Sequence, residues 1–141
     1  MANDGFSPRF GKVLTSAEAR ELNPLVLAYV GDGVQMLYLR ARLASSSHAK
    51  AGKLHTLVSG QARATAQAKA AAALVDTFDD EERAIFLRAR NSHVGSAAKH
   101  ASIAEYHSAT GLEAVFGFLY LTGRTDRLDE LLGAAFNVCS D

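Results

Sequence analysis

The stretch LNPLVLAYVGDGVQMLYLRARL, residues 22–43, constrains the fold more than any other part of the chain, because its apolar residues recur at the spacing of a long helix. It contains a single acid, Asp32, between Gly31 and Gly33. On a helix wheel Asp32 shares the face expected to turn toward the core with Leu25, Ala28, Met36 and Leu39. An unpaired carboxylate there is costly, and each glycine costs about 1 kcal/mol relative to alanine. Packing or function must therefore offset a locally unfavourable choice.

The rest of the chain also has helical patterns, and convincing strand alternation is absent. We therefore predict an all-α helical bundle. Helix starts are expected at Thr15 or Ser16, at Asn23 with Pro24 in the first helical position, at the S-x-x-E sequence beginning with Ser102, and at Thr125. An alanine-rich helix is predicted over about residues 53–74, and another within DDEERAIFLRARN.

Length and composition limit the class of protein. The 141 residues favour a single domain, 1–141, with a core over about residues 14–136. The lone cysteine, Cys139, excludes a disulfide within the chain, and the polar start MANDGFSPRF has no apolar run of a signal peptide. No apolar run approaches the ~20 residues of a membrane span. We expect a cytoplasmic, soluble protein.

Charges are balanced in number but separated along the chain. Fifteen basic and fifteen acidic residues cancel, yet no acid occurs from Gly33 to Val75 or from Arg83 to Ala104, while DTFDDEE concentrates acids between these stretches. Such a chain can present a positive face to phosphates while remaining neutral overall. Ordinary solvated helix faces would give the same pattern, so both interpretations stay open.

A second acid repeats the arrangement around Asp32. Glu113 shares a helix face with residues that are expected in the core, and Gly111 and Gly117 lie nearby. Each acid could be satisfied by a backbone or arginine partner. Two helices that both place a carboxylate among small residues could equally share one Mg²⁺ ion, which prefers oxygen ligands. Spacing alone does not decide between these alternatives.

Two segments resemble the motifs of ribonuclease III. LAYVGDGVQMLYL is similar to the signature helix of that family, and TGLEAVFGFLYLTG is similar to its second motif. The smaller Mini-ribonuclease III family is more similar still, because it shares NPLVLAYVGD, a segment like KLHTLVSGQARA, an Arg-Asn segment like RARNSH, and a helix like YHSATGLEAVFGFLYLTG. The resemblance runs in matching order from about Leu22 to Leu132.

Two departures from ribonuclease III itself follow from this comparison. Two of its carboxylate positions are occupied here by Ala28 and Thr110, as in the mini family, which puts tight binding of two metal ions in doubt. Nothing follows the catalytic domain, so no double-stranded-RNA-binding domain is expected. The RNA must then be held by the catalytic domain.

The resemblance implies a Mg²⁺-dependent endoribonuclease, with Mn²⁺ as a possible substitute. Such an enzyme cleaves double-stranded RNA to 5′-phosphate and 3′-hydroxyl ends, and the mini family trims the precursor of large-subunit (23S) ribosomal RNA. Asp32 and Glu113 would be the catalytic and metal-binding residues. The residues expected at the RNA are Arg88, Arg90, Asn91 and Lys99, followed by Lys50, Lys53, Arg63 and Lys69. The resemblance also implies a homodimer, with Tyr29, Gly31 and Gly33 at its interface.

Other readings remain. The histidines His93, His100 and His107 are rival general bases or zinc ligands, although no metal-binding spacing such as H-E-x-x-H occurs. A noncatalytic RNA- or ribosome-binding protein on the same fold is the alternative function. A third reading, an all-α metal-dependent nucleotide hydrolase, would require turnover of small phosphate esters.

Overall fold

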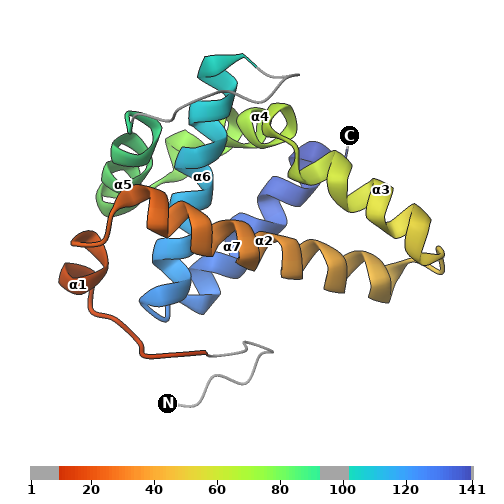
Figure 1. The fold of residues 1–141 in the computed structure, drawn as a ribbon, viewed down its shortest axis with the longest axis horizontal. Helices are drawn as coiled ribbons and strands as arrows, with labels where there is room; N and C mark the ends of the chain where they lie inside the picture. Colours follow the sequence, from red (N-terminus) through yellow and green to blue (C-terminus); the bar gives the residue numbers. More distant parts are fainter. Residues whose placement is uncertain (1–9, 93–101, 141) are drawn as a thin grey trace.

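The structure is a computed structural model that describes residues 10–92 and 102–140, and its described residues form helices and no strand (Figure 1). The predicted all-α class is confirmed. The helices are α1 (Ser16–Arg20), α2 (Pro24–Ser46), α3 (Ala51–Ala62), α4 (Ala64–Leu74), the short 3₁₀ helix η1 (Val75–Thr77), α5 (Asp80–Arg90), α6 (Ile103–Leu121) and α7 (Thr125–Cys139).

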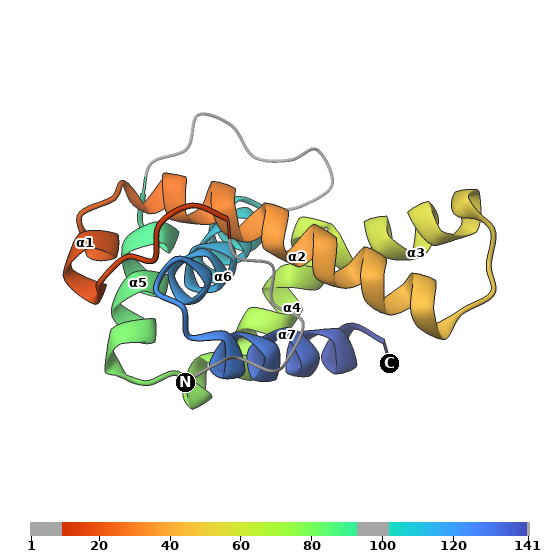
Figure 2. The same ribbon diagram turned by 90° about the horizontal axis from the view of Figure 1, so that it is seen from below.

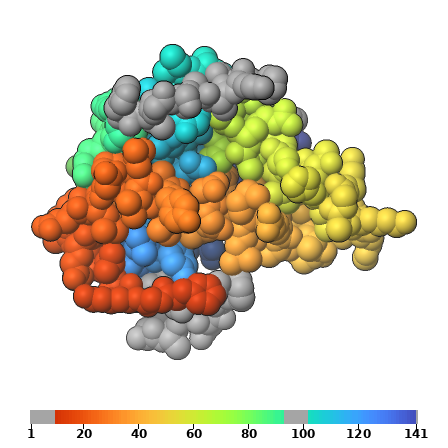
Figure 3. All heavy atoms as spheres, viewed as in Figure 1, coloured from red at the N-terminus to blue at the C-terminus, as the bar shows by residue number. Residues whose placement is uncertain are grey.

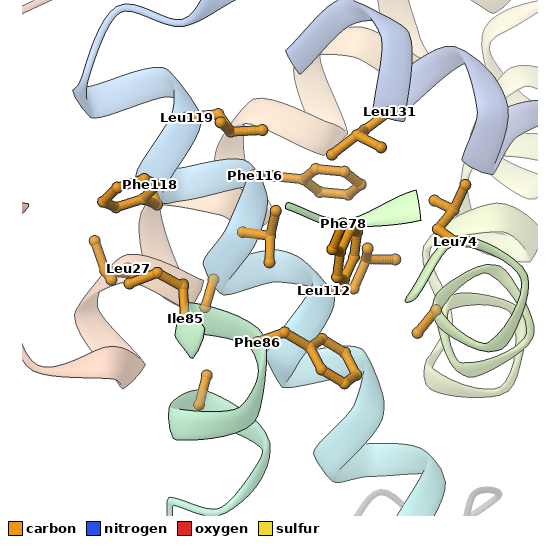
Figure 4. Packing of buried hydrophobic residues seen from close by; sticks show 14 of the residues in the cluster. Leu27, Leu74, Phe78, Ile85, Phe86, Leu112, Phe116, Phe118, Leu119 and Leu131 are labelled. Carbon is orange, nitrogen blue, oxygen red and sulfur yellow. The ribbon is translucent and has the colours of Figure 1, made fainter. Parts of the chain in front are cut away.

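Helix α6 is the centre of the bundle. Figure 2 views it nearly along its axis, with α2, α4, α5 and α7 around it. Its residues from 109 to 119 are buried except for the half-buried Glu113. Side chains from the surrounding helices fill the core against it, including Leu27, Leu74, Phe86 and Leu131 (Figure 4). A helix that is apolar on every side is stable only when other elements cover it, as they do here.

The helix starts follow the expected capping chemistry. The Asn23 side chain accepts a hydrogen bond from the Leu25 N–H at 2.8 Å, with Pro24 at the first position of α2. Ser102 forms the predicted capping box, and Thr15, one of the two residues expected to cap the first helix, forms one as well. The last helix begins at Thr125 with Arg124 as its N-cap residue, so the cap expected at Thr125 is displaced by one residue.

The single helix predicted over residues 53–74 is wrong. The chain forms two helices there, separated by Arg63, whose backbone is extended (φ −67°, ψ 156°). Helix α3 runs beside the second half of α2 and extends away from the bundle, whereas α4 packs against α6 and α7 (Figures 1 and 2). The alanine-rich sequence suits one long helix, but one straight helix could not reach both partners.

The inward face of α2 includes Ala28 and Leu39, as predicted, but it is rotated away from Asp32. Its buried residues are Leu27, Ala28, Gly31, Gln35 and Leu39, and Asp32 is exposed. The cause is the close crossing of α2 and α6: a Cβ atom added to Gly31 would lie 1.7 Å from the Glu113 carbonyl oxygen. Gly31 must therefore face α6, and Asp32, one residue further, lies at the rim of the contact.

Among the described helices, none combines the length and the hydropathy that crossing a bilayer requires.

Candidate active site

The two acids singled out by the sequence meet at the crossing of α2 and α6. Asp32 comes from α2 and Glu113 from α6, and the two carboxyl groups lie close enough to interact. Burial and the interaction with Asp32 together raise the pKa of Glu113 to about 8, while the Gln67 amide opposes the shift. The pair thus brings the oxygen atoms of two helices together at one point.

Glycines allow the two carboxyl groups to come this close. Besides Gly31, Gly117 lies in the crossing, where an added Cβ would be 1.9 Å from the Leu27 carbonyl oxygen. The backbones of α2 and α6 touch directly, so short acidic side chains on the two helices can share one site. Gly31 was expected at an interface between two chains. It packs instead against the backbone of α6 in the same chain, where it is buried.

Gln67 on α4 is the third polar group of the site, and the sequence analysis missed it. Its Nε2 donates to Glu113 Oε2 at 3.4 Å. The only signal in the sequence is a glutamine in the otherwise alanine-rich helix ATAQAKAAAAL. Sequence periodicity could not show that this glutamine faces Glu113, because α4 was not recognised as a separate helix.

The protein supplies few further ligands. Ala28 and Thr110, which stand where ribonuclease III has carboxylates, are both buried, and the Thr110 hydroxyl donates to the Tyr106 carbonyl oxygen at 3.1 Å. Within residues 10–92 and 102–140, no group of three or more His, Cys, Asp and Glu side chains could hold a metal ion. Two carboxylates are thus the acidic ligands that this part of the chain offers.

The pair nevertheless fits a divalent cation. Burial is the largest cause of the raised pKa of Glu113, and repulsion between two neighbouring ionised carboxyl groups adds to it. A cation between them removes this repulsion, and carboxylate oxygens are ligands that Mg²⁺ accepts. Asp32 is exposed, so the remaining coordination positions can be filled from solvent or by a phosphate.

The histidines contribute nothing to this pair in the described structure. His107 is half-buried on α6, and its ring lies beside that of Tyr106, with the centroids 6.3 Å apart. His93 and His100 lie outside the described residues, as does Lys99.

Two groups of basic side chains differ in whether acids neutralise them. Arg20, Arg124 and Arg127 form salt bridges with Glu81 or Glu82 at the start of α5. The other group is exposed and forms no salt bridge within the described part of the chain; it consists of Lys50, Lys53, Arg63 and Lys69 on and between α3 and α4. Helix α4 also carries Gln67, whose side-chain amide contacts Glu113. Figure 3 shows atoms of α6 between α2 and α4 on this face.

The two arginines at the end of α5 contact other parts of the same chain. The Arg88 guanidinium donates to the Arg20 carbonyl oxygen at 2.9 Å, and that of Arg90 lies 5.8 Å from the centroid of the Phe86 ring. Asn91 is exposed and ends the helix. Their expected contacts with RNA stay a prediction.

One face of α2 is apolar and has no partner within the described chain. Tyr29 is 81% exposed, and Val26 and Leu37 are exposed at helical spacing along the same face. Gly33 lies on the same face, with open space around it. This face continues into an apolar groove of about 540 Å³ between α2 and α7, lined by residues such as Val34, Tyr38, Leu128 and Leu132.

The helical fold is that of a ribonuclease III domain. A family model described as Ribonuclease III domain matches residues 25–124, which include both Asp32 and Glu113. The fold is also similar to a crystal structure of a protein from Fusobacterium nucleatum, with a TM-score of 0.79 and 23% identity over 85% of this chain and 96% of that one.

Similar proteins that carry a name indicate which branch of the ribonuclease III family this chain belongs to. The Mini-ribonuclease 3 of Clostridium tetani is 35% identical over 129 residues, which cover 91% of this chain and 85% of the relative. Those of Brevibacillus brevis and Symbiobacterium thermophilum are 38% and 39% identical, over 82% and 81% of this chain and 87% and 88% of their own lengths. The chain therefore belongs to the Mini-ribonuclease III family, and it is an endoribonuclease of the ribonuclease III type.

Proposed function

We propose that this chain hydrolyses phosphodiester bonds of double-stranded RNA with the help of Mg²⁺, leaving 5′-phosphate and 3′-hydroxyl ends. The observation that carries the proposal is the pair of carboxyl groups, Asp32 and Glu113, held against each other at the α2–α6 crossing in a member of this family.

Asp32 and Glu113 would hold the divalent ion. A bound Mg²⁺ supplies Lewis-acid polarisation of a phosphate oxygen and lowers the pKa of a bound water. The role of the protein is to present two oxygen ligands in a fixed arrangement, with Glu113 half-buried and Asp32 at the solvent side. No side chain needs to act as a nucleophile. Oxygens of the RNA phosphate would complete the set of ligands that Ala28 and Thr110 do not provide.

The exposed lysines and arginines of α3 and α4 would bind the RNA backbone. They form no salt bridge within the described residues. Helix α4 also contacts the carboxylate pair, because its Gln67 donates a hydrogen bond to Glu113. Double-stranded RNA is recognised mainly through its shape, phosphates and 2′-hydroxyls, for which such side chains suffice. Arg88, Arg90 and Asn91 at the end of α5 would add contacts with the RNA, as would Lys99, which lies outside the described residues.

The apolar face of α2 supports a homodimer. Val26, Tyr29, Gly33 and Leu37 follow one another at helical spacing, and their exposure on a single chain leaves a contiguous apolar surface. Tyr29 and Gly33 are thus proposed at the interface of two chains. Two copies would bring two carboxylate pairs to one RNA, one for each strand, which accounts for a staggered cut.

The precursor of 23S ribosomal RNA is the proposed natural substrate, because the relatives are Mini-ribonucleases. A cytoplasmic location agrees with this substrate and with the unpaired thiol of Cys139.

The deciding experiment is digestion of a long double-stranded RNA with Mg²⁺ and with EDTA, with mapping of the fragment ends. The variants Asp32→Asn and Glu113→Gln keep the size of each side chain and remove the metal ligand. We expect each to lower the cleavage rate by more than about 100-fold, since even residues that only support metal ligands cost about 10–100-fold. RNA binding in EDTA and the helical circular dichroism should not change.

Wild-type protein that binds the RNA but never cuts it would favour the noncatalytic alternative. A variant that cuts at nearly the wild-type rate would show that its altered residue is not a required ligand.

A further inference from the structure

Gln67 makes an unusual set of contacts inside the bundle. Its side chain is only 1% exposed. Nε2 donates to the Ala62 carbonyl oxygen at 3.1 Å and to Glu113 Oε2 at 3.4 Å. Both hydrogens of the amide are therefore used, one toward the backbone of α3 and one toward the carboxylate pair, whereas the buried Oε1 has no hydrogen-bond partner.

Packing alone does not explain a glutamine at this position. The other buried residues of α4 are Ala70, Ala71 and Leu74, all apolar. A buried amide oxygen without a partner destabilises the folded state, and an apolar side chain of the same size would avoid that cost. Glutamine offers two N–H groups that an apolar residue lacks, one directed at the Ala62 carbonyl oxygen and one at Glu113.

The break between α3 and α4 holds the amide in place. Ala62 is the last residue of α3, and the final carbonyl groups of a helix have no partner within it. The Gln67 amide satisfies this carbonyl with one hydrogen, which leaves the other hydrogen aimed at Glu113. The break at Arg63 thus helps to fix the Gln67 amide next to Glu113.

We propose that Gln67 is a positioning residue for Glu113. By holding one carboxylate oxygen, its amide restricts rotation of the carboxylate and presents Glu113 to the divalent ion in one orientation. Gln67 contacts neither RNA nor metal in this role, and it acts only through Glu113. The inference rests on the proposed Mg²⁺-dependent cleavage, and it assigns to α4 a function beyond carrying positive charge.

Gln35 on α2 is a matched control. It is also buried, at 5% exposed, and its Oε1 likewise has no partner. It makes no hydrogen bond to either carboxyl group. Replacing Gln35 or Gln67 by methionine removes one buried amide of the same size in each case, but only the change at Gln67 removes a contact with Glu113.

The test compares Gln67→Met and Gln35→Met with the wild-type protein in three measurements. These are the Mg²⁺ concentration for half-maximal cleavage of a double-stranded RNA, the dissociation constant of Mn²⁺ from the RNA-free protein by electron paramagnetic resonance, and the Tm in EDTA. We expect Gln67→Met to raise both metal constants roughly 10–100-fold. Its Tm and its RNA affinity in EDTA should match those of Gln35→Met, whose metal constants should be those of the wild type.

Equal metal constants for the two variants would overturn the inference, as would a loss of Tm confined to Gln67→Met without a change in metal binding. A wild-type protein that shows no Mg²⁺-dependent cleavage would instead refute the proposed function. If Gln67→Met does not fold, Gln67→Asn replaces it: this variant keeps the amide but is too short to reach Glu113, so the same rise in both metal constants is expected.

Discussion

At the scale of single residues, the chemistry of the site depends on where two ordinary carboxyl groups are placed. Asp32 is exposed and Glu113 half-buried, and their contact couples them. A neighbouring negative charge and partial burial both favour the protonated form of Glu113. The metal-free protein therefore holds a proton where the proposed enzyme holds a cation, and the two compete.

This competition predicts how stability depends on pH. The pKa of Glu113 is about 8 in the folded chain and near 4.5 when the chain is unfolded, so between these values the folded state binds the extra proton. The free energy of unfolding in EDTA should fall as the pH rises from 4.5 to 8, and each unit of pKa difference corresponds to about 1.36 kcal/mol. Urea unfolding at a series of pH values measures this slope.

Glu113→Gln is the control, because it cannot ionise and should remove most of that slope. A variant with the same pH dependence as the wild type would show that another group is responsible.

At the scale of the helices, the site depends on how closely α2 approaches α6. Both Gly31 and Gly117 lie where an added Cβ would collide with the backbone of the opposite helix. Backbone atoms cannot move aside as a flexible side chain can, so the clash must separate the helices. Such separation would also pull Asp32 away from Glu113.

We therefore expect Gly31→Ala to destabilise the protein by at least about 1–3 kcal/mol, the usual cost of overpacking a core. Gly60→Ala in α3 is the control: an added Cβ there meets nothing within 4 Å, and the better helix propensity of alanine should leave stability equal or slightly raised. Thermal unfolding followed by circular dichroism compares them. Equal Tm values for the two variants would contradict the close crossing.

A second prediction at this scale concerns RNA binding by the basic residues of α3 and α4. If Lys53 and Lys69 contact phosphates, removing either charge with alanine should weaken RNA binding and lower the slope of log affinity against log salt by about 1. Lys12 is exposed and paired with Glu18 near the start of the chain, so Lys12→Ala is the control and should leave the slope unchanged. Filter binding in EDTA at several salt concentrations measures it. If the slope of log affinity against log salt does not change for Lys69→Ala, Lys69 is a solvated surface residue that does not contact a phosphate.

At the scale of the whole molecule, metal and RNA are expected to bind together. The described chain offers two acidic ligands, with Ala28 and Thr110 in place of two more. Binding of Mg²⁺ to the RNA-free protein should therefore be weak, and phosphate oxygens must supply further ligands. Thermodynamic linkage then requires that each partner tighten the binding of the other.

The expected outcome is a Mg²⁺ requirement for cleavage that falls as the RNA concentration rises. Calorimetric titration of the RNA-free protein with Mg²⁺ gives the reference value. Tight binding of two ions per chain without RNA would mean that further ligands complete the site, and the account with two carboxylates would have to be abandoned.

The sequence by itself determined the helical class, most helix boundaries and the two acids of the site. These features depend on local rules: the apolar spacing, the caps at Asn23 and Ser102, and motifs whose order along the chain indicated the family. Local rules predict structure well where neighbouring residues decide it.

The tertiary structure decided the rest. It turned Gly31 rather than Asp32 toward the core, because two backbones meet there, and it broke the alanine-rich helix at Arg63 so that α4 could reach α6. It also placed Gln67 beside Glu113, 46 positions apart in the chain. Helix rotation, the break and this pairing depend on contacts between distant segments, and no local pattern of residues contains that information.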